Sequence, residues 1–449
     1  MQELKVSQYN YFFDSEDETH LAFNALSGAF ATITDEKYRM VQDILAHPNT
    51  YRFDTKEKTE LREKMIRGGF LINKSISEID IVKMRYRTGK YANNSFGLTI
   101  APTMNCNFNC IYCYEQYQKG TMNSKVIEAL VFFVREKIKN VKHFSVTWFG
   151  GEPLLAFDII KKLTEEFKKL CEINHCIYHA DMITNGYLLS EEVARELEKL
   201  EVSSVQITVD GPPEIHDRRR MLKNGKGTFD VIWKNLKNLA NLKSIHTVLR
   251  VNADLTNKTG VFKFLDFFDK EGLKEKIPVY IGRVQDINNC ANYGGQCTAL
   301  ASKEFCDFDF EVSKEMLRRD FRFFGVPGPR SSRCVGDSMT GFVVGPTGHL
   351  YKCWNHVGNI EESVGFLRPD GFSSNEKLAQ WFFWEPFNSK ACLNCKLLPV
   401  CMGSCPYKSL ANKNPGACCD DEWKFGLIKR LKIYYEFKKI HPEKQEWEK

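Results

Sequence analysis

The chain has no long apolar run, no low-complexity tract and no strong excess of either charge. No segment approaches the ~20 consecutive apolar residues of a membrane span, and residues 1–5 read MQELK, with polar and acidic residues where a secretory signal is apolar. Lys and Arg number 63 against 57 Asp and Glu, and the net charge of +6 is too small for the basic footprint of a nucleic-acid binder. We therefore expect a soluble, cytoplasmic protein whose main partner is neither a membrane nor a nucleic acid.

The chain is rich in apolar residues and in cysteine. Its 449 residues exceed one ordinary domain, so two or three folding units are expected. Apolar residues make up 43% of the sequence and charged residues 27%, which predicts a globular protein. The 16 cysteines are clustered and are more than a reducing cytosol tolerates as disulfides. Chemistry at sulfur is therefore the main functional signal.

Residues 1–92 contain no cysteine and predict a small α+β module. Strands are expected near Tyr9–Phe13 and Ala29–Thr34, helices over Asp35–Leu45 and Lys56–Ile66, and an apolar edge at 70–72. This order suits a winged-helix-like module. It equally suits an amino-terminal extension that packs on the next domain.

Residues 93–287 alternate apolar runs with longer amphipathic stretches, which predicts six βα units. The expected strands are Gly97–Ala101, Phe144–Phe149, Ile177–Thr184, Ser204–Val209, His246–Asn252 and Pro278–Arg283. The expected helices are Lys125–Ile138, Phe157–Cys171, Ser190–Leu200, Phe229–Leu242 and Lys263–Glu271. Right-handed crossovers make such a repeat a parallel sheet that curls into a partial (β/α)6 barrel, a TIM-like α/β fold whose chemistry lies where strands end.

Residues 288–449 lose this periodicity, and Gly, Pro and Cys punctuate short segments. We expect a third region here, with a bridging part, a Cys-rich iron–sulfur domain and a closing helix over Glu422–Lys439. The basic side of that helix is interpreted as a solvated face.

Three thiols follow the first predicted strand: Cys106, Cys110 and Cys113. A structural zinc site needs four ligands, and no His or fourth Cys lies nearby. Three thiolates instead suit an iron–sulfur cubane with one open iron, which can bind a substrate or cofactor. A zinc knuckle that borrows a distant fourth ligand stays open as an alternative.

These residues carry a resemblance, because Cys106, Cys110, Tyr112 and Cys113 match the CxxxCxΦC signature of the radical S-adenosylmethionine (SAM) superfamily. Companion motifs of that family resemble segments after the following strands, namely Gly150-Gly151-Glu152-Pro153, Thr184-Asn185-Gly186, Thr208-Val209-Asp210-Gly211, His216-Asp217 with Arg220, and Arg250-Val251-Asn252. The resemblance implies a [4Fe–4S] cluster and SAM as cofactors.

The resemblance also implies roles for these residues. Glu152 and the backbone at Gly150 and Gly151 would receive the methionyl ammonium group, because glycine permits close approach and a carboxylate pairs with a cation. The other polar groups at the strand ends would contact the ribose and carboxylate of SAM. The implied cofactor-binding set is Tyr112, Gly150, Gly151, Glu152, Thr184, Asn185, Thr208, Asp210, Arg220 and Asn252.

A second cysteine block has the spacing C-x2-C-x5-C-x3-C and consists of Cys392, Cys395, Cys401 and Cys405. Alone it fits zinc or a cluster. Together with Cys334, Gly348, Cys353 and the pair Cys418-Cys419 it is similar to the SPASM domain of many radical SAM enzymes.

The SPASM resemblance implies two auxiliary [4Fe–4S] clusters. Cys334, Cys353 and Cys405 would hold the first, and Cys392, Cys395 and Cys401 with Cys418 or Cys419 the second. The fourth ligand of the first cluster stays open between the spare member of that pair, an upstream thiol (Cys290, Cys297 or Cys306), and none. Apart from that possible ligand role, the thiols outside the two clusters are interpreted as buried or incidental, namely Cys171, Cys176, Cys290, Cys297 and Cys306.

From this resemblance we expect reductive cleavage of SAM to a 5′-deoxyadenosyl radical, which abstracts hydrogen from a peptide substrate. The expected product is a thioether or carbon–carbon crosslink in a ribosomal precursor peptide. Residues 1–92 would recognise a leader peptide at a sheet edge near 29–34, and a flavodoxin or ferredoxin would supply electrons.

Two alternatives remain at this point. One is an anaerobic sulfatase-maturating, formylglycine-generating enzyme, although that family has a catalytic Asp where this chain has Trp354. The other is a zinc-binding scaffold protein, which would be colourless and would not cleave SAM.

Overall fold

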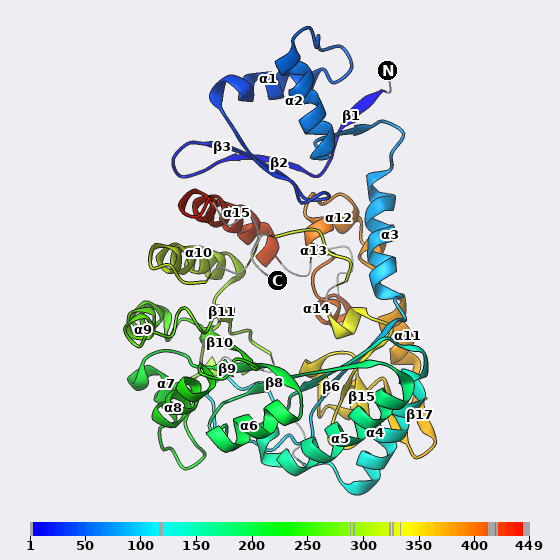
Figure 1. Ribbon diagram of the computed structural model, residues 1–449, viewed down its shortest axis with the longest axis vertical. Helices are drawn as coiled ribbons and strands as arrows, with labels where there is room; N and C mark the ends of the chain where they lie inside the picture. The colour runs from blue at the N-terminus through cyan, green and yellow to red at the C-terminus, as the bar shows by residue number, and fades with distance from the viewer. Residues whose placement is uncertain are drawn as a thin grey trace. The chain divides into compact units, whose positions relative to one another are not determined.

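The computed structural model of the protein (Figure 1) describes residues 3–442 except 116–119, 288, 291, 323–324, 326, 333, 412–417 and 419–420, and leaves out the side chains of Asn292 and Tyr293. Contacts divide the chain into two compact units. Unit 1 consists of Met1–Tyr91, Gly325–Arg333 and Trp384–Lys449, and unit 2 of Ala92–Phe324 and Cys334–Phe383. Each unit therefore draws on segments that are distant in the sequence.

Unit 2 is built on a ten-stranded sheet with the order β11-β10-β9-β8-β7-β6-β14-β15-β16-β17. Its strands are β6 (Ser95–Ile100), β7 (His143–Trp148), β8 (Ile177–Thr184), β9 (Val202–Thr208), β10 (His246–Ala253), β11 (Val279–Arg283), β14 (Gly341–Val344), β15 (His349–Tyr351), β16 (Gly365–Arg368) and β17 (Gly371–Ser374). The strands from β6 to β11 are parallel to one another. The predicted α/β class and large parallel sheet are therefore confirmed, and the sheet is consistent with a partial barrel.

Helices connect the parallel strands of unit 2 and cover one face of the sheet (Figure 1). The connecting helices are α4 (Ser124–Lys137), α5 (Phe157–Asn174), α6 (Glu191–Lys199), α7 (Pro213–Arg219), α8 (Phe229–Leu239) and α9 (Lys258–Lys270). Unit 2 also contains the hairpin β12 (Asn292–Tyr293) and β13 (Gln296–Cys297) and the helices α10 (Ser302–Arg318) and α11 (Glu376–Phe383). Alternate strand residues point into this helical layer. Phe144 of β7, for example, meets Phe167 of α5 edge to face, with ring centroids 5.3 Å apart.

Strand β14 extends the parallel sheet from a region where no βα unit was expected. It pairs in parallel with β6, from Gly341 opposite Gly97 to Val344 opposite Ile100, and β15, β16 and β17 continue the sheet in antiparallel order. A three-residue apolar run among glycines has too little periodicity to predict such a strand.

Unit 1 contains a three-stranded antiparallel sheet, β2-β3-β4, and an antiparallel pair, β1-β5. Its elements are β1 (Leu4–Val6), β2 (Asn10–Asp14), β3 (His20–Asn24), β4 (Phe30–Ile33), α1 (Asp35–Ala46), α2 (Lys56–Arg67), β5 (Leu71–Asn73), α3 (Glu78–Lys90), α12 (Lys390–Leu393), α13 (Leu398–Cys401), α14 (Pro406–Ala411) and α15 (Glu422–Ile440). The two expected strands and two expected helices are present. Strands β1 and β3 and helix α3 were not expected.

The core of unit 1 joins the two ends of the chain. Tyr9, Phe23 and Val82 are buried in the same hydrophobic cluster as Leu398 and Leu427. The chain first passes from unit 1 to unit 2 between Tyr91 and Ala92, at the expected position near residue 92. The expected boundary near 288 does not coincide with a unit boundary, because 334–383 belong with the large sheet and 384–442 with the amino-terminal residues. In the described part of the chain, no helix combines the length and apolarity needed to cross a bilayer.

Candidate active site

The first cysteine loop begins where β6 ends and is fixed by its backbone. Three hydrogen bonds of 2.9 to 3.1 Å join residues 107–111 of the loop to residues 219–223, at the carboxyl end of α7 and just after it. Cys106, Cys110 and Cys113 are half-buried and are not in disulfides. The sequence between β9 and α8 therefore positions a loop that lies about 110 residues earlier in the chain.

Burial keeps these three thiols protonated in the absence of a metal. It raises the pKa of Cys106 to about 11 and that of Cys113 to about 12, with neighbouring carboxylate and thiol charges adding to the shift, and it also raises the pKa of Cys110. Thiolate ligands at this loop would need the positive charge of bound iron to compensate for that burial. Among the described residues, no three His, Cys, Asp or Glu side chains form a group that could hold a single metal ion.

The turn after β7 packs against the start of the cysteine loop without intervening side chains. Gly150 has a φ of +119°, and a Cβ atom there would lie 2.3 Å from the Thr103 carbonyl oxygen. A Cβ atom on Gly151 would lie 2.4 Å from the Asn105 carbonyl oxygen, and the Glu152 amide donates to that same oxygen over 2.9 Å. Only glycine allows this backbone approach.

Glu152 is fully buried and links three strand ends. Its carboxylate accepts hydrogen bonds from the Thr184 hydroxyl at 2.7 Å, the Asn185 amide at 2.8 Å and the Leu154 amide at 3.1 Å. Burial raises its pKa, and these three hydrogen bonds oppose that shift. The Asn185 side chain also donates to Asn107 Oδ1 of the cysteine loop over 2.8 Å. The structure thus brings together the predicted residues that follow β6, β7 and β8.

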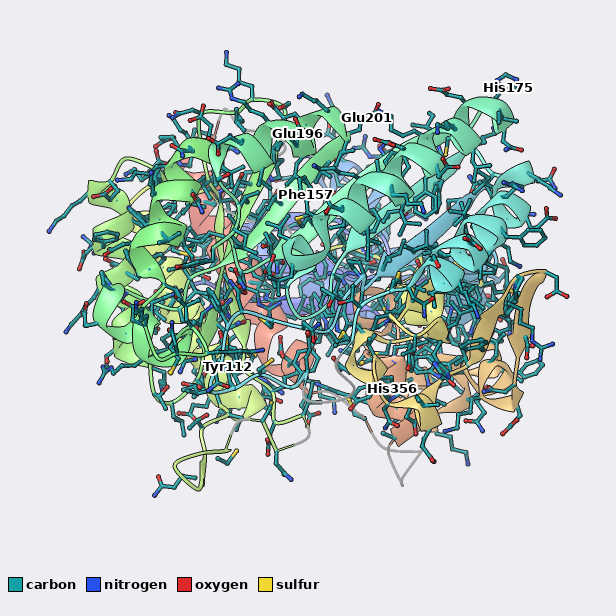
Figure 2. All side chains as sticks on the ribbon, turned by 90° about the horizontal axis from the view of Figure 1, so that it is seen from below. Tyr112, Phe157, His175, Glu196, Glu201 and His356 are labelled. Atoms are coloured by element: carbon teal, nitrogen blue, oxygen red, sulfur yellow. The ribbon has the colours of Figure 1, made fainter. Side chains whose placement is uncertain are left out.

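Tyr112, Arg220 and Asn252 form a second group at the same edge of the sheet. The Tyr112 hydroxyl, labelled in Figure 2, accepts hydrogen bonds from Arg220 Nη1 at 2.8 Å and Asn252 Nδ2 at 3.1 Å. Two buried donors have no hydrogen-bond partner among the described residues. They are Nε of Arg220 itself and Nδ2 of Asn107 in the cysteine loop. Buried unpaired donors are costly, so this edge is suited to an additional acceptor such as a bound cofactor.

Asp210 is engaged by the predicted residue Asn252 and by Arg219, which the sequence did not single out. Its carboxylate accepts from Arg219 Nε and from the Asn252 amide, each at 3.2 Å, and Arg219 Nη1 donates to Asp254 at 2.8 Å. Asp210 therefore ties β9 to β10 and to α7 in this structure. Thr208, the last residue of β9, is buried two residues before it. The sequence could not identify Arg219, because it is one of three consecutive arginines. Asp254 could have been identified, because it is an acidic residue directly after β10.

His216 supports the same network from α7. Its Nδ1 accepts from the Asp210 amide at 3.2 Å, and its Nε2 lies 3.0 Å from the Thr228 hydroxyl. Burial lowers its pKa to about 3, and the neighbouring Arg220 contributes to that shift. His216 is therefore neutral, and its hydrogen bonds hold the segment from His216 to Arg220 in place.

The cysteines expected of the auxiliary clusters are divided between the units. Cys334 and Cys353 belong to unit 2. Trp354 follows Cys353, and its ring stacks on Phe149 with ring centroids 5.7 Å apart. Phe149 is the residue directly before Gly150. The position that holds Asp in sulfatase maturases is thus occupied here by an aromatic ring at the edge of the site.

The second cysteine block lies in unit 1. Cys392, Cys395 and Cys401 pack against the core of that unit, and three consecutive residues with positive φ, Met402, Gly403 and Ser404, lead from Cys401 to Cys405. Cys418 is half-buried, whereas Cys419 lies outside the described residues. Of the other thiols, Cys171, Cys176, Cys290 and Cys306 are buried and Cys297 is exposed.

A parallel α/β sheet with three thiols after its first strand and a Gly-Gly-Glu-Pro turn after its second defines the radical SAM class. The comparison with known families agrees, because residues 100–252 match the radical SAM superfamily. The chain therefore carries a radical SAM domain over these residues. This match favours the radical SAM interpretation over the zinc-binding scaffold considered from the sequence, and the radical SAM family implies a [4Fe–4S] cluster and SAM.

Several curated proteins are similar to the chain. The radical SAM cyclopropyl synthase TigE of Paramaledivibacter caminithermalis is 22% identical, with 96% of each chain covered. The cysteine-type anaerobic sulfatase-maturating enzyme of Clostridium novyi is 26% identical over 69% of this chain and 88% of its own length. The mycofactocin maturase MftC of Mycolicibacterium smegmatis is 24% identical over 75% and 85%. The protein is therefore related to peptide and sulfatase maturases.

Two solved structures share the fold. Native anSMEcpe with bound AdoMet and Cp18Cys peptide has a TM-score of 0.57 at 20% identity, covering 77% of this chain and 97% of that chain. Streptococcus suis SuiB bound to its precursor peptide SuiA has a TM-score of 0.52 at 14% identity, covering 94% and 99%. At these identities the likeness concerns the fold alone.

Proposed function

We propose that the protein is a peptide-modifying radical SAM enzyme whose cluster is held by Cys106, Cys110 and Cys113. The observation that carries this proposal is the convergence of the cysteine loop, the Gly150-Gly151 turn and the Glu152 network at one edge of the parallel sheet. When bound, the cluster and SAM supply a 5′-deoxyadenosyl radical that removes a hydrogen atom from the substrate.

The chain's own residues bind and orient the cofactor. Gly150 and Gly151 let the turn approach the cysteine loop closely, and Glu152 is the carboxylate proposed to accept the methionyl ammonium group. Arg220 Nε is an unused buried donor that suits an anionic oxygen of the cofactor. Thr184, Asn185, Tyr112 and Asn252 hold these groups in position, and Thr208 and Asp210 complete the proposed cofactor-binding set.

The proposed substrate is a ribosomal precursor peptide, in which the enzyme installs a thioether or carbon–carbon bond. TigE, which this chain matches over 96% of its length, is named as a cyclopropyl synthase, and SuiB is solved with a precursor peptide. The sheet β2-β3-β4 of unit 1 is the proposed leader-peptide site, with β4 as its edge. Sulfatase maturation is the second candidate because of the Clostridium novyi relative. It is less favoured, since Trp354 rather than a carboxylate follows Cys353.

We also propose that Cys392, Cys395 and Cys401 ligate an auxiliary cluster. Met402 and Ser404 adopt left-handed backbone conformations next to these thiols. Such strain in non-glycine residues is concentrated at functional sites. Assignment of Cys334, Cys353 and Cys405 to a further cluster stays a prediction from the resemblance, as does reduction by a flavodoxin or ferredoxin.

The test of the proposed function is SAM cleavage by the anaerobically reconstituted holoenzyme with dithionite. Changing Cys106, Cys110 and Cys113 together to Ala is expected to abolish 5′-deoxyadenosine formation while iron at the second cysteine block remains. The matched control is Cys171→Ala, which removes a thiol that has no proposed ligand role and is expected to cleave SAM normally. Cleavage by the triple variant would contradict the proposal.

The substrate class is tested separately with short peptides from the open reading frames that are found beside the gene on sequencing. Co-expression followed by mass spectrometry is expected to show the loss of two hydrogens for each bond formed. Conversion of a Cys to formylglycine in a sulfatase peptide would instead support the second candidate.

A further inference from the structure

One face of the parallel sheet in unit 2, here called the inner face, lies opposite the helical layer. On β7 and β8 the buried residues alternate with half-buried ones, so that Thr147 and Asp181 point to the inner face. Strand register places Asp181 directly between Thr147 of β7 and Ser204 of β9. The inner face therefore carries an acidic side chain flanked by two hydroxyl residues.

The strand next to Asp181 is irregular. The pairing of β8 with β9 shifts between Ala180 and Asp181, which leaves Ser203 as an extra residue whose hydroxyl donates to the Ala180 carbonyl over 3.2 Å. Bulges of this kind re-aim side chains and are frequent beside active sites. The irregularity thus coincides with the one acidic residue of β8.

The Asp181 carboxylate has no hydrogen-bond or ion-pair partner among the described residues, in contrast to Glu152 and Asp210. Burial raises its pKa, and only His179 opposes the shift. A half-buried carboxylate without a partner is unfavourable, and a cation or strong donor that enters the site would relieve that cost.

The inner face connects Asp181 to the cofactor site through apolar side chains. Ile183, two residues further along β8, packs against the cluster that contains Phe149. Phe149 in turn stacks with Trp354 and precedes Gly150. A side chain that enters from the cofactor edge would therefore meet apolar groups first and the carboxylate beyond them.

We propose that Asp181 binds a basic side chain, Lys or Arg, of the peptide substrate and thereby positions the peptide at the cofactor. The half-buried Ile183 suits the methylene stem of such a residue, and the carboxylate suits its charged head. This inference rests on the proposed function, because it assumes a peptide substrate.

The test uses the reconstituted holoenzyme and the precursor peptide encoded beside the gene. Asp181→Asn is expected to raise KM for the peptide by about tenfold or more, as expected for a lost charge-assisted hydrogen bond, while kcat changes much less. Iron content and 5′-deoxyadenosine formation without peptide are expected to stay at the wild-type level. Asp181→Glu is expected to restore part of the affinity, and Asp230→Asn, on the exposed side of α8, is the matched control.

A second arm changes the peptide. Each Lys or Arg is replaced in turn by norleucine, and one replacement is expected to raise KM as much as Asp181→Asn does, with no further increase when the two changes are combined. If every replacement leaves KM unchanged while Asp181→Asn raises it, the basic-side-chain assignment is overturned.

Other outcomes are also decisive. Wild-type KM in Asp181→Asn overturns the inference and leaves the proposed function intact. Loss of iron or of peptide-independent SAM cleavage in that variant shows a structural role and also overturns it. If the wild-type enzyme cleaves SAM but modifies no peptide, the peptide-modifying function itself fails and the inference fails with it.

Discussion

Glu152, Thr184 and Asn185 show how single residues hold the cofactor edge in one arrangement. The buried Glu152 carboxylate would be unfavourable alone, but it accepts hydrogen bonds from three donors. The side chain of Asn185 also donates to Asn107 of the cysteine loop. A fully satisfied buried network rigidifies its surroundings. The residues that are proposed to bind SAM are therefore positioned before the cofactor arrives.

Glu152→Gln is expected to destabilise the protein because the amide NH2 group would face a hydrogen-bond donor. Leaving such donors unsatisfied costs about 1–3 kcal/mol of unfolding free energy, so the thermal unfolding temperature of the anaerobic protein should fall. SAM affinity should fall as well, since an amide pairs poorly with an ammonium group. The matched control is Glu191→Gln, which changes an exposed carboxylate paired with Arg195 and should leave both measurements unchanged. Equal effects of the two variants would contradict the role of Glu152.

Residue types and spacing predicted most of the groups at this edge, but not which side chains they bond. The three consecutive arginines at 218–220 illustrate the limit. Arg219 turns to Asp210 and Asp254, whereas Arg220 turns to Tyr112. That division depends on where α7 ends, at Arg219, and helix ends are among the least certain features of a sequence-based prediction.

At the scale of elements, the cysteine loop depends on two neighbours rather than on its own structure. The turn after β7 touches its first residues backbone to backbone, and residues 219–223 hold its middle. The three thiols therefore keep their places only while both neighbours do.

Gly151→Ala tests this dependence. The added methyl group would lie 2.4 Å from a backbone oxygen of Asn105, and overpacking of this kind costs about 1–3 kcal/mol. We expect displacement of the cysteine loop, measured as less iron per chain after reconstitution and a lower unfolding temperature. Gly328→Ala is the control, because a Cβ atom there meets nothing within 4 Å. Full iron loading of Gly151→Ala would show that the turn does not position the loop.

Strands with strong βα periodicity were predictable, and isolated short ones were not. The strands from β6 to β11 fall within a few residues of their expected ranges, because each follows or precedes a long amphipathic helix. Strand β14 has four residues, Gly341–Val344, and its partner β6 lies more than 200 residues earlier. Local pattern carries no record of such a pairing.

At the scale of the molecule, the amino-terminal strands and the second cysteine block form one folding unit. Tyr11 of β2 packs on the same core as Cys395 and Cys401. Burial raises the pKa of Tyr11, and negative charge on these two cysteines adds to the shift. The proposed leader-peptide sheet and the proposed auxiliary-cluster ligands therefore share their hydrophobic support. The sequence suggested two separate regions, since core sharing between distant segments leaves no local signal.

Leu398→Ala tests this shared core. Leu398 lies in α13 between the cysteines and is almost fully buried against residues of β3 and α3, and a buried Leu→Ala change costs about 2–5 kcal/mol. We expect faster amide hydrogen exchange in His20–Asn24 and Glu78–Lys90, although both segments precede the substitution by more than 300 residues. The control Leu265→Ala removes an equally buried side chain from α9 of unit 2 and should increase exchange there instead. Unchanged exchange in β3 and α3 of Leu398→Ala would mean that the amino-terminal sheet is stable without the cysteine block, and that leader recognition and the auxiliary cluster are independent.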